Sequence, residues 1–240
     1  MRIASETASD NSGAAAGYYP SVEPSPAEVQ THFDFLKKVF DCDALTVLFS
    51  EDELPSLLFY LLEGQVKLSM NSSSGRRLIL GIAQPGDTLG LAANLSGDRY
   101  DTTAEAVSAC RLASIERESY LDLLARYPAA YKNVVRELCR DRARAHEQLR
   151  TFGLAISAPA KLARLLLEWC DDGQKTDQGT RLSCGFTHGE IGEFIGASRE
   201  TVSRVLSEFK CHDLLQSRGS TLIISNVKAL ELYASIGKFD

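Results

Sequence analysis

The sequence predicts an α+β chain in which a segment of short strands comes first and a set of helices follows. Residues 45–117 carry short apolar runs, some with period-two alternation, that turn residues separate. Residues 128–152 contain no glycine and no proline after the first residue, and their apolar residues recur at helical spacing. Residues 187–209 hold two short helical patterns, each preceded by a residue that caps helices. Strands and helices therefore occupy separate parts of the chain.

Composition sets the broad class. The chain has 240 residues, of which 44% are hydrophobic and 24% are charged, as in ordinary soluble globular proteins. The apolar runs fall well short of the roughly 20 residues that span a membrane, and no secretory signal is recognised, so we expect a cytoplasmic protein without a membrane partner. The six cysteines lack the C-x-x-C spacing of structural zinc or iron–sulfur sites, so we predict reduced thiols and no metal site.

Two segments precede the strands. Residues 1–26 are rich in Ala, Ser, Gly and Pro and hold too little apolar surface to order themselves, so we expect a flexible tail. Residues 29–40 have apolar side chains at helical spacing and are predicted to form a short packing helix.

The strand segment is predicted to fold as a closed roll of two sheets, the jelly-roll arrangement, because short strands follow one another closely. The polar stretch Asn71–Gly75 predicts a hairpin turn, and Pro85-Gly86-Asp87 ends another strand. The predicted strands cover residues 57–62, 66–70, 77–82, 103–107 and 111–115.

A short helix at 118–125 and a long helix at 128–152 are predicted next. The long helix has a narrow apolar seam and charged residues on its other faces. Its seam is formed by Val135, Leu138, Ala145, Leu149 and Phe152, with Arg142 as an interruption. Such a stripe most often packs against a partner helix, so we expect a homodimer; packing within the chain is the alternative.

A second domain is expected after a hinge that Gly153 and Pro159 mark. Residues 160–170 are predicted as an apolar helix and residues 171–179 as a polar loop. Further on, residues 214–217 and 221–224 are predicted as two strands of a hairpin with a polar tip.

Residues 187–209 carry the most informative pattern. Thr187 and Glu190 form a capping box, which begins one short helix. Gly196-Ala197 predicts a tight turn, and Ser198 is suited to cap a second helix over residues 199–209. Two short helices joined by a tight glycine turn indicate a helix-turn-helix, and the hairpin that follows serves as the wing of a winged helix.

The second helix leaves a polar face exposed when its apolar stripe is buried. The residues of this face suit the edges of DNA bases, because Arg grips guanine and Glu accepts a hydrogen bond from cytosine. The candidate base contacts are Arg199, Glu200, Ser203 and Arg204. The candidate phosphate contacts, which position the protein without reading sequence, are Thr187, Ser198, Thr201, Arg218 and Ser220.

The stretch FTHGEIGEFIGASRETVSRVL at 186–206 closely resembles the DNA-binding domain of the cAMP receptor protein/FNR (Crp/Fnr) family of bacterial transcription regulators. The motifs LEGQV at 62–66 and PGD at 85–87 extend the resemblance over roughly residues 45–226. It implies a cyclic-nucleotide-binding-like double-stranded β roll, a long dimerisation helix and a C-terminal winged helix-turn-helix. The expected domains are the tail at 1–26, the sensor at 27–127, the dimerisation helix at 128–153 and the DNA-binding domain at 154–240.

The resemblance also implies partners. A homodimer would read a palindrome in double-stranded DNA, with half-sites about one helical turn apart. The Glu200, Ser203 and Arg204 combination is similar to FNR-like members, whereas Arg199 is similar to the cAMP receptor protein, so we expect a half-site around TTGA or GTGA. RNA polymerase is an implied partner, and family members touch it with the segment that corresponds to residues 171–179.

We expect the β roll to sense a small molecule or a redox signal, and action without an effector is the alternative. The resemblance places a candidate effector pocket at Gly90, Leu91, Arg99, Tyr100, Asp101, Thr102 and His146. Leu91 stands where cAMP-binding members carry a glutamate, and Tyr100-Asp101 stand where they carry an Arg-Ser pair, so we do not expect cAMP. No cysteine precedes Cys42, which argues against an N-terminal iron–sulfur cluster, and no haem or other cofactor is predicted.

We therefore predict a DNA-binding transcription regulator and not an enzyme. The strand segment has no histidine for a metal, and no catalytic triad or phosphate-cradling loop is recognised. The alternative is a cyclic-nucleotide-responsive module that acts on another protein. The formal net charge of −6 does not exclude DNA, because residues 128–164 hold eight basic and three acidic side chains while residues 1–60 hold three basic and ten acidic.

Overall fold

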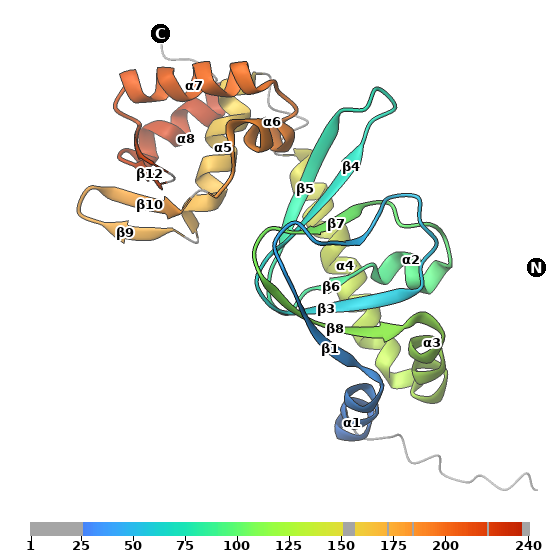
Figure 1. The fold of residues 1–240 in the computed structure, drawn as a ribbon. Helices are drawn as coiled ribbons and strands as arrows, with labels where there is room; N and C mark the ends of the chain where they lie inside the picture. Colours follow the sequence, from blue (N-terminus) through green and yellow to red (C-terminus); the bar gives the residue numbers. More distant parts are fainter. Residues whose placement is uncertain (1–25, 151–156, 172, 184, 220, 237–240) are drawn as a thin grey trace, which may run out of the picture.

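The computed structural model describes residues 26–150, 157–171, 173–183, 185–219 and 221–236 (Figure 1). The tail predicted at 1–26 lies outside these residues apart from Pro26. The predicted α+β class is confirmed within the described residues. Figure 1 shows the early strands gathered around α4, Tyr131–Gln148, and the later helices set beyond its C-terminal end.

The early strands form a roll of two antiparallel sheets. One sheet has the order β1-β8-β3-β6 and the other has the order β2-β7-β4-β5. Both sheets contribute to one apolar core, in which Leu61, Val66, Ala104 and Leu112 are fully buried. The strands are β1 Lys38–Cys42, β2 Val47–Phe49, β3 Leu57–Glu63, β4 Val66–Asn71, β5 Arg77–Ala83, β6 Thr88–Leu89, β7 Thr103–Ala106 and β8 Cys110–Glu116.

The helix predicted for residues 29–40 is wrong in its second half. The helix α1 covers Pro26–Leu36, and β1 then pairs with β8. Phe40 lies in that pairing, and its ring packs edge-on against Phe59 with 6.2 Å between the ring centroids. Its helical spacing is coincidental, because Phe40 is packed against the apolar core of the roll as part of a strand. The short elements β2, β6 and α2, Leu91–Ser96, are also additions to the predicted set.

The helix α4 has two different faces. It follows α3, Arg117–Arg126, and a 3-10 turn at Pro128–Ala130. One face packs on the roll, where Val134 is buried in a cluster with residues of α3. On the other face, Val135 is 55% exposed and Leu149, just after the helix, is 69% exposed. These two residues belong to the predicted seam, whose last member, Phe152, lies outside the described residues.

The C-terminal part combines helices with one small sheet. Leu162 and Leu166 are fully buried in its core together with Val202 and Phe209. Pro159 lies in the first turn of its first helix, where proline is tolerated, and Gly153 lies outside the described residues. The elements are α5 Ala158–Asp171, β9 Gln174–Thr176, β10 Gly179–Ser183, α6 His188–Ile195, α7 Arg199–Cys211, β11 Leu215–Arg218, β12 Thr221–Ile224 and α8 Val227–Ile236.

The loop predicted for residues 171–179 is wrong in part. The strand β9 lies within this segment and pairs with β10, which begins at Gly179. The Thr176 hydroxyl donates to the Gly179 carbonyl oxygen at 2.7 Å across the turn. All three residues of β9 are exposed. An exposed edge strand needs no apolar residue, which explains why its composition is that of a loop.

None of the helices that the structure describes combines the length and the apolar composition that a bilayer requires.

Tyr120 in α3 gives the fold a predicted dependence on alkaline pH. Burial, with smaller contributions from Glu137 and Tyr131, raises the pKa of Tyr120 to about 12. The unfolded chain loses this proton near pH 10, so the folded state holds more protons above that pH and its stability falls between pH 10 and 12. We expect the Tyr120→Phe variant to lose about 2 kcal/mol less than the wild type over this range. Urea unfolding at each pH measures the difference, and parallel pH profiles for the two proteins would contradict it.

Candidate nucleic-acid interface

The helix α6 begins with the predicted capping box, which is confirmed. The Thr187 hydroxyl oxygen accepts the Glu190 backbone N–H at 3.2 Å, and the Glu190 carboxylate accepts the Thr187 backbone N–H at 2.9 Å. The Thr187 hydroxyl also donates to that carboxylate at 3.0 Å. Helix starts leave amide groups without partners, and these bonds satisfy two of them. The first turn of α6 is therefore closely held.

A tight turn joins α6 to α7. Gly196 has a φ of 67°, in the left-handed region that glycine adopts without strain. The Ala197 N–H donates to the Gly192 carbonyl oxygen at 2.9 Å. A Cβ atom at position 192 would lie 2.5 Å from the Ala197 carbonyl oxygen. The angle between the two helices thus depends on a close approach of two backbones.

The helix α7 presents the predicted polar face. Ser198 caps it as predicted, by accepting the Thr201 N–H at 3.2 Å. Its inner side is buried through Val202, Val205, Leu206 and Phe209. On the opposite side, Arg199, Glu200 and Arg204 are exposed, whereas Ser203 is only partly exposed. The structure therefore brings the four candidate base contacts onto one side of one helix.

His188 is tied to this face in a way that the sequence analysis missed. Its Nδ1 atom lies 2.8 Å from the Ser203 hydroxyl oxygen, and that hydroxyl donates to the Arg199 carbonyl oxygen at 3.0 Å. The single hydroxyl proton is used in the second bond, so His188 is the donor in the first. Ser203 is left with acceptor capacity alone, and the first turn of α6 is linked directly to α7.

Glu200 stands at the start of α7. A hydrogen bond from its own backbone N–H, one from the Ser198 hydroxyl and the charge of Arg199 together hold the pKa of Glu200 below its usual value. The carboxylate is therefore ionised at neutral pH and acts as an acceptor, which suits the amino group of cytosine.

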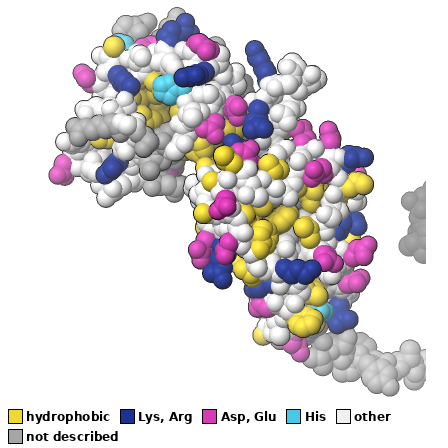
Figure 2. Space-filling model, viewed as in Figure 1, with side chains coloured by type: hydrophobic (Ala, Val, Ile, Leu, Met, Phe, Trp, Pro, Cys, Tyr) yellow, Lys and Arg dark blue, Asp and Glu magenta, His cyan; other side chains and the backbone are white. Residues whose placement is uncertain are grey.

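The candidate phosphate contacts are only partly described. The Thr187 and Ser198 hydroxyls both take part in helix caps, as does the backbone N–H of Thr201. The wing is present as the hairpin of β11 and β12, with Gly219 at a φ of 59° in its turn. The side chain of Arg218 and the whole of Ser220 lie outside the described residues. Figure 2 shows basic, acidic and histidine side chains together over the lobe that holds α6 and α7.

The candidate effector residues lie in different surroundings, and none of them lines the two cavities described below. Tyr100 is 3% exposed, its ring stacks on Phe49 with 4.0 Å between centroids, and its hydroxyl donates to the Leu57 carbonyl oxygen at 2.7 Å. Leu91 belongs to a different apolar cluster, together with residues of α3. Arg99 donates to the Asp52 carbonyl oxygen. The remaining members are Gly90 beside the Tyr100 ring, Asp101 and His146 exposed, and Thr102 partly exposed.

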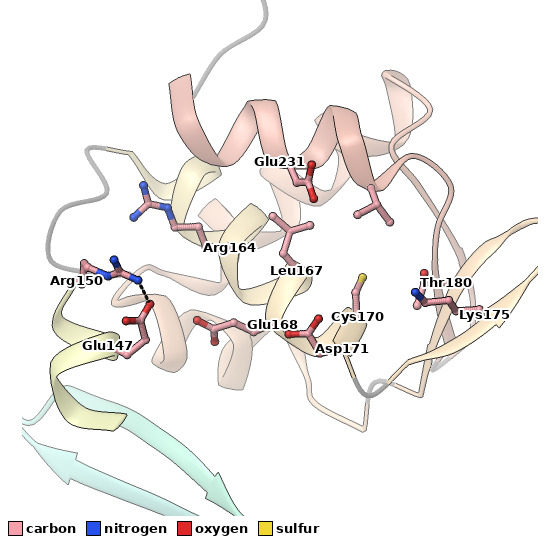
Figure 3. A pocket seen from close by; sticks show the side chains of 11 residues that line it. Glu147, Arg150, Arg164, Leu167, Glu168, Cys170, Asp171, Lys175, Thr180 and Glu231 are labelled. Carbon is pink, nitrogen blue, oxygen red and sulfur yellow. Dashed lines mark hydrogen bonds and ion pairs between the residues drawn. The ribbon is translucent and has the colours of Figure 1, made fainter. Parts of the chain in front are cut away.

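Two cavities lie instead near the junction of α4 and α5. The larger has a volume of about 1130 Å³ and lies between β5, α4, α5 and β10, with Trp169 and Phe194 among its lining residues. The second, of about 600 Å³, is lined by α4, α5 and α8 (Figure 3). In it, Arg150 donates to Glu147 at 2.7 Å, and burial together with the charges of Glu147 and Asp171 raises the pKa of Glu168. Within the described residues no group of His, Cys, Asp and Glu has the arrangement of a metal site.

Two family models match the chain. A Crp-like helix-turn-helix domain matches residues 160–233, and a cyclic nucleotide-binding domain matches residues 41–127. The first match covers α5 to α8, and the second covers the strands of the roll after β1 together with α3. The polar face of α7 therefore falls within the match to the helix-turn-helix domain, and most of the roll falls within the match to the cyclic nucleotide-binding domain.

Individual proteins resemble the chain over most of its length. The CRP-like cAMP-activated global transcriptional regulator of Mycobacterium tuberculosis is 27% identical over 218 residues, which are 90% of this chain and 96% of that protein. The transcriptional activatory protein AadR of Rhodopseudomonas palustris is 30% identical over 169 residues, which are 70% of this chain and 69% of that protein. The c-di-GMP responsive global regulator CLP of Xanthomonas campestris shares the fold with a TM-score of 0.74 at 20% identity, over 83% of this chain and 99% of that one.

The close approach at Gly192 predicts the effect of a single methyl group. The Gly192→Ala variant would force its Cβ against the Ala197 carbonyl oxygen, which is backbone and cannot rotate away. We expect α6 and α7 to separate, with a loss of about 2 kcal/mol or more in the free energy of unfolding of the C-terminal part. Urea unfolding followed by the emission of Trp169, the only tryptophan of the chain, measures this loss.

Gly189 in the same helix provides the control. A Cβ at Gly189 would lie 3.6 Å from the Thr187 hydroxyl oxygen, an ordinary contact. The Gly189→Ala variant should keep or slightly raise stability, because alanine favours a helix. Equal stabilities for the two variants would show that the turn tolerates a wider spacing.

Proposed function

This chain belongs to the Crp/Fnr family of transcription regulators, and from that membership we propose that two copies of it read a palindromic DNA site with their α7 helices. It is a DNA-binding regulator that joins a helix-turn-helix to a domain of the cyclic-nucleotide-binding kind. The observation that carries the proposal is the polar side of α7, where three charged side chains stand exposed on a helix whose start and inner face are fixed.

We assign base reading to this side of α7. Arg204 and Arg199 have the fork of donors that matches the O6 and N7 atoms of guanine, and Glu200 accepts from cytosine. Ser203 contributes an acceptor oxygen, because its proton is engaged with the Arg199 carbonyl oxygen. The half-site is proposed to be around TTGA or GTGA.

We assign phosphate contacts to the residues around the two helix starts and the wing. The N-termini of α6 and α7 carry partial positive charge, which attracts phosphate. Thr187, Ser198 and Thr201 lie at these starts, and Arg218 is the last residue of β11 in the wing. Ser220 is assigned as a phosphate contact from the sequence alone. Thr187–Phe209 carries four glutamates and two arginines, so non-specific affinity is expected to be modest and strongly dependent on salt.

We propose that α4 forms the dimer contact. Three large apolar residues on one side of this segment are exposed in the single chain: Tyr131 by 44%, Val135 by 55% and Leu149 by 69%. Together with Leu138, Arg142 and Ala145 they follow the alternating four- and three-residue spacing of a coiled-coil seam. A second copy of the same helix is the partner that this spacing fits.

The remaining assignments follow from the family. We propose a cytoplasmic protein that contacts RNA polymerase, with the hairpin of β9 and β10 as the contact region. We propose an effector other than cAMP, because Tyr100 and Leu91 are built into apolar clusters and Asp101 would repel a phosphate. No cofactor is assigned to the chain.

Selection of binding sites from random double-stranded DNA tests the function most directly. We expect the recovered duplexes to share an inverted repeat of a half-site. Selections run with and without added metabolites are compared, and a repeat that is enriched only with a metabolite shows that an effector is needed. If no sequence is enriched with or without metabolites, the reading of a palindromic site is contradicted, and the alternative of a regulatory module that acts on another protein is favoured.

The Arg204→Ala variant tests the reading of bases. We expect it to lose about 1–3 kcal/mol per half-site contact on a selected duplex, while its weak binding to unrelated DNA is kept. Fluorescence anisotropy at one salt concentration measures both affinities. Arg126→Ala, at an exposed arginine of α3, is the control and should bind as the wild type does. Undiminished specificity in the Arg204 variant would remove this residue from the interface.

The dimer seam makes a separate prediction. The double variant Val135→Glu, Leu149→Glu places charges where two copies of α4 would meet, so we expect a folded monomer with weak affinity for a palindrome. Sedimentation equilibrium measures the mass. Arg140→Glu changes a residue on the side of α4 opposite the seam and should remain dimeric. A dimer that survives the double variant would place the contact elsewhere.

A further inference from the structure

A buried ion cluster lies where the roll meets the helix-turn-helix. Lys67 of β4 is only 5% exposed, which is rare for lysine. Its Nζ atom lies 3.3 Å from the Glu105 carboxylate of β7 and 3.4 Å from the Glu190 carboxylate of α6. Figure 1 shows the hairpin of β4 and β5 rising beside α6. One lysine of the sensor thus bonds a residue of the DNA-binding domain 123 positions away.

An apolar contact accompanies this bond. Ile79 of β5 is 3% exposed and belongs to the same core cluster as Ile191, Phe194 and Ile195 of α6. The ion cluster and the apolar contact together attach α6 to the roll at two points. A rotation of the helix-turn-helix about either of these two contacts would break the other contact.

The charges of the cluster make Lys67 essential to it. The cluster holds three carboxylates and two cations. The carboxylates are those of Glu105, Glu190 and Glu193, and the cations are Lys67 and Arg77. The Arg77 guanidinium lies 3.5 Å from the Glu105 carboxylate. One Glu193 carboxylate oxygen is buried without a hydrogen-bond partner among the described residues. Removing the lysine would leave three carboxylates facing one half-exposed arginine. Buried charges that lose their partner are costly, so the contact would open.

The protonation of the two glutamates of α6 fits this arrangement. Burial opposes ionisation of Glu190, but its bonds with Thr187 and the charge of Lys67 outweigh this and lower its pKa. Burial raises the pKa of Glu193, and the charges of Arg77 and Lys67 only partly offset it. Of the two glutamates of α6, Glu190 is therefore the one that pairs with Lys67, at 3.4 Å.

The contact reaches the base-reading face through two steps. Glu190 is the capping-box residue of α6, so the bond with Lys67 holds the first turn of that helix. His188 in the same turn bonds Ser203 of α7. We propose that Lys67 is a positioning residue, which fixes the orientation of α6 and α7 on the roll and so holds the two α7 helices of the dimer at one separation.

This inference rests on the proposed function, because only a dimer that reads two half-sites needs a fixed separation. Two binding modules held rigidly at the right distance bind a double site far more tightly than either binds alone. If the modules turn freely, the second half-site gains much less from the first. Loss of Lys67 should therefore weaken binding to a palindrome and leave binding to a single half-site nearly unchanged.

The test compares Lys67→Met with Lys38→Met. Lys38 pairs with Glu116 at 2.9 Å, but both side chains are largely exposed, so the same substitution there removes an ion pair of the roll far from α6. Anisotropy measures the affinity of each protein for a selected palindromic duplex and for a duplex with one half-site. We expect Lys67→Met to lower the palindrome affinity by about tenfold or more and the half-site affinity by less than about twofold. Lys38→Met should match the wild type on both duplexes.

A second variant and a second measurement guard against a folding defect. Glu190→Gln keeps an acceptor for the capping box and removes the charge that holds Lys67, so it should reproduce the selective loss. In the free proteins, Trp169, which stacks against Phe186 beside α6, should show emission shifted to longer wavelength in both interface variants and not in Lys38→Met. Equal losses on the two duplexes, or no loss, would overturn the positioning role. If the wild-type protein binds the palindromic duplex no more tightly than the duplex with one half-site, both the proposed function and this inference are overturned.

Discussion

The close approach of two backbones at Gly192 and Ala197 is the constraint on which the DNA-binding half depends. It allows α7 to leave α6 at a sharp angle, and the angle lets both helices cover the apolar side of α5. Once Val202 and Phe209 are buried in that core, Arg199, Glu200 and Arg204 have no place except on the surface. The face proposed to read bases is thus a consequence of packing, since the same stripe that stabilises the helix determines which residues remain exposed.

Among the described residues, the sensor is joined to this unit by contacts of different kinds. Ile79 extends the apolar core of the C-terminal part into the roll, and Lys67 crosses the same junction with a buried ion pair. The helix α4 contributes in another way, because one face is packed on the roll while the other displays an apolar seam. Within the described residues, these contacts are routes by which a signal in the roll can act on DNA binding, to the extent that the signal favours one arrangement over another.

The elements that local chemistry determines could be predicted from the sequence. The capping box at Thr187, the cap at Ser198 and the turn at Gly196 depend on residues within a few positions of one another, and all three are confirmed. The helical spacing places Phe40 in the wrong element because its partner in the core, Phe59, is distant in sequence. The burial of Lys67, the bond between His188 and Ser203 and the packing of Tyr100 also depend on distant partners. Polarity alone indicates an exposed side chain at such positions, which is why the ion cluster could not be foreseen.

Chemical protection of guanine N7 on a selected duplex tests the central claim most directly, because N7 is exposed in the major groove where α7 is proposed to lie. The protected guanines are expected to form two groups whose centres are about 10 base pairs apart, one for each copy of the chain. Protection confined to a single group, or binding that leaves every major-groove guanine reactive, would contradict the account.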